Sequence, residues 1–365
     1  MLLILFVATL SSFFLTILLI RFQHLHVQFS ADCDLNGIQK FHAVPVPRIG
    51  GVPIFSGLIV GFAVSYLTQN NLMGLQLLMV ALPAAGAGLI EDLTKKVSVR
   101  QRLFATFVAA LLGSVFLHAN IQSLDIGWLD QLLGRYWIVS VLFTMVAVGG
   151  VAHSINIIDG YNGLSGMVAL FVFIALAYVS FKVNDGALLA VCFAACGAVL
   201  GFLCLNYPRG LIFSGDGGAY LVGFLIAEVS VLLVIRNPQV SPWFPLLLVI
   251  YPVFETVFSM YRRKFLQDRA VGCPDALHLH QMVYRRMVRW MVGSKEARHL
   301  TRRNSLTAPY LWGLAALSVA PAMLFWNHTH TLMACVFLFV MIYLYVYRMI
   351  VRFKTPTWLV VRRRR

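Results

Sequence analysis

Long apolar stretches alternate with short polar segments along almost the whole chain. About eleven of these stretches are roughly 17 to 25 residues long, which is the length that an α-helix needs to cross a bilayer. They lie near residues 2–20, 50–68, 72–90, 103–119, 136–155, 163–181, 187–205, 217–235, 243–260, 309–327 and 331–350. The pattern therefore predicts an all-α integral membrane protein with about eleven transmembrane helices.

The composition agrees with this pattern, because the 365 residues are 60% hydrophobic and only 12% charged. A soluble domain has about twice that share of charged residues, so lipid has to solvate much of this surface. The first apolar stretch lacks a basic start, and its first positive charge, Arg21, follows it. We therefore expect a spanning helix with its N-terminus outside rather than a cleaved signal peptide.

The basic residues indicate how the helices are oriented. With the N-terminus outside, all but three of the 29 Lys and Arg residues fall on the predicted cytoplasmic side, and the exceptions are Arg135, Lys182 and Arg236. This asymmetry follows the positive-inside rule and predicts a cytoplasmic C-terminus. We expect one polytopic domain over 1–350, cytoplasmic loops at 21–49, 91–102, 156–162, 206–216 and 261–308, and a basic cytoplasmic tail at 351–365.

The net charge of +15 is spread over short segments between apolar runs. Anionic lipid headgroups and anionic substrates are therefore the expected partners, and nucleic acid is not. The six cysteines form no CxxC pair, so we interpret them as small buried side chains rather than disulfides or metal ligands.

Two adjacent carboxylates, Glu91 and Asp92, follow the third apolar stretch. They stand at the C-terminal end of a predicted helix, where the helix dipole is already negative, so a cation has to compensate them. Lys95 and Lys96 could do this. A divalent ion such as Mg²⁺, which prefers carboxylate oxygens and phosphate, is the alternative.

A polar stripe ends the stretch at 136–155. If the helix continues, His153, Asn156 and Asp159 lie three residues apart and share one face at the membrane surface. The competing interpretation is an ordinary helix end, since Asn and Asp favour turns.

Asp216 stands among glycines just before the apolar stretch at 217–235. It could serve only as a helix N-cap. Glycines also let the backbone approach a phosphate or a metal at the positive end of a helix, and the two roles are compatible.

His278 and His280 lie in the last large loop, within a strongly basic stretch. Their side chains point the same way only if the segment is extended, which disfavours a helical zinc site. Imidazoles beside arginines suit a diphosphate better. Glu255 is near enough along the chain to support this site, whereas Glu228 lies too deep in its helix to take part.

These motifs together resemble the polyprenyl-phosphate N-acetylhexosamine-1-phosphate transferase family, of the glycosyltransferase family 4 type. The resemblance runs from about residue 40 to residue 281. It is carried in order by KFHAVPVPRIGG at 40–51, ED at 91–92, NIIDG at 156–160, FSGD at 213–216 and HLH at 278–280.

The resemblance implies a reaction in which undecaprenyl phosphate attacks a UDP-N-acetylhexosamine, UMP leaves and a lipid-linked sugar diphosphate remains. It also implies Mg²⁺, with Mn²⁺ as an alternative ion, and a location in the bacterial inner membrane. Phosphoryl transfer depends mainly on positioning and on neutralising charge, so cations and helix N-termini suit it. A homodimer is one possible oligomeric state.

Residue roles follow from the same resemblance. Asp216 is the expected metal ligand, and Asp92 either activates the lipid phosphate or assists the metal. The implied catalytic residues are Asp92, Glu91, Asp159 and Asp216, and the implied substrate-binding residues are Lys40, Arg48, Lys95, Asn156, Asn162, His278 and His280.

The departures from the family pattern concern the sugar more than the reaction. The HLHQ sequence at 278–281, preceded by Asp275, resembles the surface-polysaccharide branch more than the peptidoglycan branch, whose members carry three consecutive histidines. We therefore expect UDP-N-acetylglucosamine or a related donor, used to begin a polysaccharide such as O-antigen. The main rival is a transporter or flippase that binds a lipid-linked sugar without chemistry, and it predicts ionisable residues near the bilayer midplane.

Overall fold

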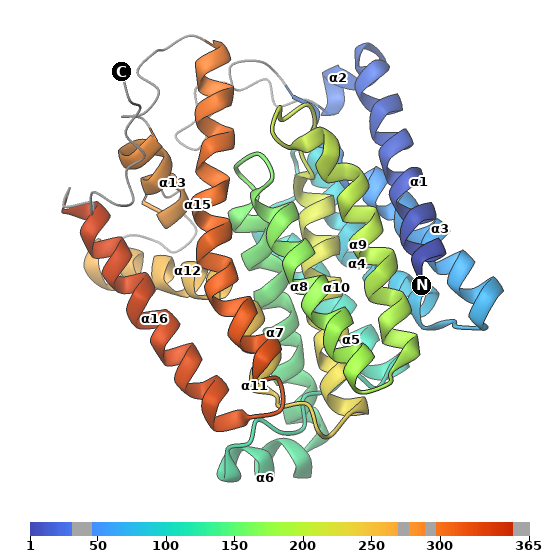
Figure 1. The fold of residues 1–365 in the computed structure, drawn as a ribbon, viewed down its shortest axis with the longest axis vertical. Coiled ribbons are helices and arrows are strands. Elements are labelled where there is room, and N and C mark those ends of the chain that lie inside the picture. The colour runs from blue at the N-terminus through green and yellow to red at the C-terminus, as the bar shows by residue number, and fades with distance from the viewer. Residues whose placement is uncertain (31–45, 269–276, 289–296, 353–365) are drawn as a thin grey trace.

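The computed structural model describes residues 1–30, 46–268, 277–288 and 297–352. All regular elements in these ranges are helices (Figure 1). The first half contains α1 (Leu2–Arg21), α2 (Gln23–Ser30), α3 (Gly51–Gln69), α4 (Met73–Thr94), α5 (Val99–Phe116), α6 (Gly127–Arg135), α7 (Trp137–Ile158) and α8 (Leu164–Lys182). The second half contains α9 (Gly186–Asn206), α10 (Gly215–Arg236), α11 (Trp243–Leu248), α12 (Ile250–Tyr261), η1 (Arg262–Leu266), α13 (Leu279–Met282), η2 (Val283–Val288), α15 (Ala297–Leu324) and α16 (Thr329–Val351).

Ten of these helices are long and apolar enough to cross a membrane, within the part of the chain that the structure describes. Their bounds follow the predicted apolar stretches closely. The stretch expected at 187–205, for example, is α9 at Gly186–Asn206. The prediction of an all-α, multi-pass membrane protein is therefore confirmed.

The stretch at 243–260 does not form the single straight helix that was expected. It is divided at Val249 into α11 and α12, and α12 lies across the direction of its neighbours (Figure 1). The physical reason is Pro252, which has no N–H to donate to the carbonyl of Leu248 and whose ring collides with that carbonyl in a continuous helix. The break turns α12 and its Glu255 toward the end of the bundle that carries the other polar residues.

Two further helical segments differ from the expected layout. The short helix α6 forms at the end of the bundle that carries the α7 N-terminus, in a segment expected to be a plain connection (Figure 1). The expected cytoplasmic loop at 261–308 ends in helix, because α15 already begins at Ala297. As a result Asn304 and Ser305 are held on a rigid element.

The centre of the bundle is α10, which packs against α3, α4, α7 and α8. Almost all of its residues are buried, from Gly215 to Leu233, whereas only 22% of the residues in the spanning part of α1 and 17% of those in α16 are buried. Lipid covers the outer helices, so α10 is solvated by protein along its whole length. Its N-terminal end is where the predicted site residues meet.

Candidate active site

Asp92 binds the N-terminus of α10. Its two carboxylate oxygens accept hydrogen bonds from the backbone N–H groups of Asp216 and Gly217, both at 2.8 Å. The positive end of one helix therefore meets the negative end of another, and this contact offsets the unfavourable position of a carboxylate at the end of α4. From the sequence, lysines or a metal ion were the expected partners for the negative charge at this helix end. In the structure the partners of Asp92 are backbone N–H groups.

The close approach of α4 and α10 depends on Gly88. A Cβ atom at this position would lie 2.6 Å from the backbone carbon of Asp216 and 2.6 Å from the nitrogen of Gly217. Gly215 adds the turn into α10, since its φ of +68° is one that other residues rarely adopt. The N-cap of α10 is Ser214 and Asp216 lies in the first turn, so of the two roles that the sequence left open for Asp216 the N-cap role does not apply.

Asp216 is buried, and its carboxylate faces three donors from three different elements. The Nη2 atom of Arg48 lies 3.3 Å from Oδ1, and the amide of Asn156 donates to Oδ1 at 3.0 Å. Arg102, near the start of α5, forms an ion pair with Oδ2. Asp216 is therefore the point at which α5, α7, α10 and the segment before α3 converge.

The polar stripe predicted on α7 is present and faces α10. His153 lies 2.9 Å from the hydroxyl of Tyr220, Asn156 donates to Asp216, and Asp159 accepts from Ser214. The spacing of three residues thus places His153 and Asn156 on one face, as expected, whereas α7 ends at Ile158 and Asp159 lies just beyond it.

Asp159 follows α7 and is held by two serine hydroxyls. Ser214 donates to Oδ2 at 2.5 Å, and Ser165 donates to Oδ1. Burial raises the pKa of the Asp159 carboxyl, although these hydrogen bonds and the charge of Arg48 act in the opposite direction. Asp159 therefore links the 159–163 turn to both α8 and the start of α10.

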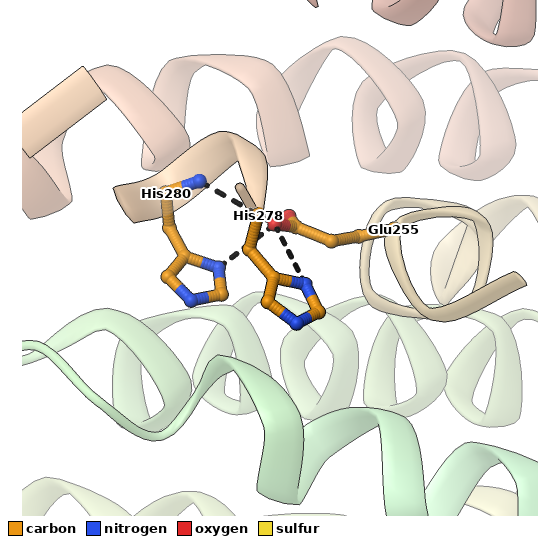
Figure 2. Close-up of side chains that lie close together, drawn as sticks. All are labelled: Glu255, His278 and His280. Atoms are coloured by element: carbon orange, nitrogen blue, oxygen red, sulfur yellow. Dashed lines mark hydrogen bonds and ion pairs between the residues drawn. The ribbon is translucent and has the colours of Figure 1, made fainter. Parts of the chain in front are cut away.

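His278, His280 and Glu255 form a second buried cluster (Figure 2). The Nδ1 atom of His280 lies 2.8 Å from Oε1 of Glu255, and that of His278 lies 3.8 Å from the same oxygen. His278 is extended and the two rings are nearly parallel, with centroids 5.2 Å apart. The side chains point the same way although only His278 is extended and His280 lies in α13, so the expectation that an extended segment is required does not hold.

Tyr161 joins the two clusters. Its ring packs edge-on against His280, with centroids 5.5 Å apart, and it lies two residues from Asp159. The two groups of predicted site residues are thus parts of one continuous polar region.

The other predicted residues either lie outside this region or form contacts that hold the surrounding turns and helices in place. Glu91 accepts a hydrogen bond from the backbone N–H of Val97 at 2.7 Å and so closes the turn between α4 and α5. Lys95 ends α4 in a left-handed conformation and is exposed. Lys40 falls outside the residues that the structure describes.

Asn162 is completely buried, and its hydrogen bonds link three segments of the chain. Its side chain donates to the carbonyl of Pro208 and to the hydroxyl of Ser305, both at 3.1 Å, and its backbone N–H donates to Asn304. It therefore holds the 159–163 turn against the 207–210 segment and α15.

Arg102 is a member of the site that sequence reasoning missed. It was counted only as one of the basic residues that define topology. Its position in the first turn of a spanning helix was the available signal, because a cation there opposes the helix dipole and needs an anionic partner. The structure supplies that partner in Asp216.

The donor set around Asp216 fits a hard divalent cation such as Mg²⁺. Asp92 and Asp216 offer carboxylate oxygens close together at a helix N-terminus, and each Asp92 oxygen keeps one lone pair beyond its backbone hydrogen bond. Asp216 is also paired with two guanidinium groups, so a bound ion would replace at least one of them there.

Comparison with known proteins agrees with this membrane-embedded, phosphate-suited site. Residues 74–234 match glycosyl transferase family 4. A probable undecaprenyl-phosphate N-acetylglucosaminyl 1-phosphate transferase of Bacillus subtilis is 26% identical over 255 residues, which is 68% of each chain. An undecaprenyl-phosphate alpha-N-acetylglucosaminyl 1-phosphate transferase of Escherichia coli is 24% identical over 69% of each chain.

A phospho-N-acetylmuramoyl-pentapeptide-transferase of Listeria monocytogenes is 29% identical over 58% of this chain and 66% of its own. The fold is that of a multi-pass membrane protein, and the relatives that it resembles are named as transferases. The matched family and the names of these relatives support the polyprenyl-phosphate N-acetylhexosamine-1-phosphate transferase family that the sequence motifs indicated. Relatives of both branches match, so the comparisons do not separate the branches.

Proposed function

We propose that this protein transfers an N-acetylhexosamine-1-phosphate from a UDP-sugar to undecaprenyl phosphate, releases UMP, and depends on Mg²⁺. An oxygen of the lipid phosphate forms a new bond to the β-phosphorus of the donor. The bond between that phosphorus and the bridging oxygen of UMP breaks, and UMP leaves with the bonding electrons. The product is the sugar joined to the lipid through a diphosphate.

One observation carries this proposal, namely the convergence of acids and arginines at the N-terminus of α10. Asp92, Asp159 and Asp216 meet Arg48 and Arg102 there, and the groups come from five different segments of the chain. Phosphoryl transfer requires charge neutralisation and alignment rather than a covalent intermediate, and this cluster supplies both signs of charge on rigid helices.

The residues of the cluster divide the work. Asp216 and Asp92 are the proposed Mg²⁺ ligands, and Asn156 supports them by donating to Asp216. Bound Mg²⁺ would neutralise charge on the diphosphate oxygens. Arg48 and Arg102, when released from Asp216, are placed to bind phosphate oxygens.

UDP-N-acetylglucosamine is the favoured donor. Two of the relatives described above carry N-acetylglucosaminyl in their names, and the HLHQ sequence at 278–281 differs from three consecutive histidines. In this proposal the protein lies in the bacterial inner membrane and begins a cell-surface polysaccharide such as O-antigen.

The purified protein, supplied with undecaprenyl phosphate, tests the proposal. A panel of UDP-N-acetylhexosamines, including a UDP-muramoyl-peptide, is added in the presence of Mg²⁺, and UMP is measured by chromatography. We expect UMP only when both lipid phosphate and donor are present, and fastest with UDP-N-acetylglucosamine. Chelation should stop the reaction, and added Mg²⁺ should restore it.

Two controls make this test decisive. Undecaprenol, which lacks the phosphate, should give no UMP, because the nucleophile is missing. Size-exclusion chromatography should show that the protein stays folded throughout. A folded protein that releases no UMP from any donor, or that only moves lipid-linked sugar between leaflets, contradicts the proposal and favours the transporter.

A further inference from the structure

Glu255 is an acid that the family motifs did not assign. It lies on α12, its side chain is fully buried, and both histidines of the HLH segment turn a ring nitrogen toward it (Figure 2). An ionised carboxylate at such a position costs several kcal/mol unless it has close charged or hydrogen-bonding partners. The two imidazoles are those partners.

We propose that Glu255 is a positioning residue that holds the Nδ1–H group of His280 and, through the stacked His280 ring, orients His278, so that the Nε2 atoms of both rings form the edge that meets the donor diphosphate. The last clause rests on the proposed function. Which nitrogen of a histidine carries the proton is decided by the partner of the other nitrogen. One carboxylate therefore fixes both rings.

The direction of the rings agrees with this role. In Figure 2 the Nδ1 atoms face Glu255, and the Nε2 atoms of both rings point away from it toward the same side. The nearly parallel rings move as a pair, and Tyr161 packs against His280 and connects the pair to the Asp159 turn. The Nε2 atoms of both histidines therefore form one edge on the side away from Glu255.

The position of Glu255 relative to the histidines is itself fixed. Arg262, directly after α12, donates to the carbonyl of Leu277 at 2.9 Å and to the hydroxyl of Tyr347 at 2.8 Å. Leu277 precedes His278, so one guanidinium binds α12, the histidine segment and α16 together. The break at Val249 is what places α12 within reach.

A divalent cation held by the same three groups is the competing explanation. Two observations favour a proton, rather than a metal ion, between the imidazole nitrogens and the carboxylate. The 2.8 Å between His280 and Glu255 is the distance of a charge-assisted N–H···O contact, whereas two ligands of a tetrahedral zinc ion lie about 3.3 Å apart. The positive charge of Arg285 also acts on Tyr161, which packs against His280, and a nearby positive charge disfavours a bound cation.

Nitrogen NMR of ¹⁵N-histidine-labelled protein tests the proposal without using activity. In the wild type we expect the ring signals of His280 to show a protonated Nδ1. Glu255→Gln is nearly the same size but cannot hold the N–H donor as an anion, so the His280 signals should shift, and those of the stacked His278 ring with them. His278→Asn and His280→Asn assign the signals by removing them one at a time.

Glu228→Gln is the matched control. It changes another fully buried glutamate to the amide of the same size, and this side chain faces Gly113 of α5. Its histidine spectrum should equal that of the wild type. Unchanged His280 signals in Glu255→Gln would overturn the proposal, as would equal shifts in the Glu228→Gln control.

Kinetics extend the test to the proposed function. Glu255→Gln should lower kcat/KM for the UDP-sugar by roughly 10- to 100-fold, as expected when the group that orients a functional histidine is lost. Glu255→Asp keeps the charge and should recover part of this loss. If the shifts occur but no transferase activity exists in the wild type, the positioning role stands and only its diphosphate clause fails.

Titration with Zn²⁺ alone addresses the competing explanation. We expect no stoichiometric binding that depends on Glu255. One equivalent of tightly bound Zn²⁺ in the wild type that is lost in Glu255→Gln would overturn the proton-holding role in favour of a metal centre.

Discussion

The two ends of α10 both carry buried ionic contacts, but they are built differently. At the C-terminal end Arg236 donates to Asp185 from Nε at 2.7 Å, while Asp185 caps the N-terminus of α9 through the N–H of Leu188. Asn237 adds one more donor to the same carboxylate. One acid, one base and one amide satisfy each other.

The N-terminal end holds more charge than its own structure needs. Capping the helix requires only Asp92, yet Asp216 and Asp159 lie beside it, and Arg48 and Arg102 come from other elements. Buried charges are costly, so a surplus of them is typical of sites that bind or react. The difference shows how a structural ion pair can be told from a functional one, even at the ends of a single helix.

Neutralising one acid at each end should separate the two roles most clearly. We expect Asp216→Asn to lower the rate of UMP release by roughly 10²- to 10³-fold, the range for losing one preorganised charged group in an active site. Asp185→Asn should change the rate by less than about twofold, because it removes only a structural contact.

Both rates are normalised to folded protein measured by size-exclusion chromatography. A similar loss of activity in the two variants would show that the ends of α10 do not differ in this way.

The contact between α4 and α10 offers a second comparison. Gly88→Ala would drive a methyl group into the backbone of α10, and overpacking of this kind costs about 1–3 kcal/mol. The free energy of unfolding should fall by that amount, and the Asp92 contact should loosen. Gly86→Ala, on the same helix, meets nothing within 4 Å and should leave stability unchanged.

Denaturant unfolding in detergent measures both alanine variants. Equal stability of the two would mean that α4 and α10 can separate without cost, and the close approach would then not hold the site.

The smallest effect concerns the Asp185 pair and its dependence on pH. Burial raises the pKa of Asp185, but hydrogen bonds from Arg236 and Leu188 and the charge of Arg236 outweigh this and hold the pKa below its ordinary value. The pair therefore stabilises the protein above the unfolded pKa of about 3.9, and this contribution is lost as the pH falls through the lower folded pKa.

Relative to Asp185→Asn, the wild type should be more stable by about 0.5–1 kcal/mol at neutral pH, a small value because Arg236 is 42% exposed. The gap should close in acid, as measured by thermal unfolding across the pH range. A gap of constant size at every pH would contradict the role of the carboxylate charge.

Most of the helices were predictable because crossing a bilayer demands long apolar runs, and these are visible in the sequence. The exception at 243–260 has a local cause, Pro252, which a count of apolar residues does not register. The polar face of α7 was also predictable, because helical spacing sets the face of His153 and Asn156, whereas Asp159 lies just beyond the helix end.

The partners of the predicted residues were harder to predict from the sequence. Asp92 binds backbone N–H groups 124 and 125 positions away, and only tertiary packing brings them together. Asn162 has the residue type of a ligand contact, yet its hydrogen bonds go to Pro208 and Ser305. Residue type and spacing indicate which side chains could take part, but they do not say what each one binds.

The central position of α10 has a consequence for the membrane that surrounds the protein. A helix that meets lipid tilts or shifts when bilayer thickness changes, at a cost of fractions of a kcal/mol per Å of mismatch. α10 is enclosed by protein, whereas few residues of α1 and α16 are buried. The outer helices therefore absorb changes in lipid chain length, and the geometry around Asp216 is insulated from them.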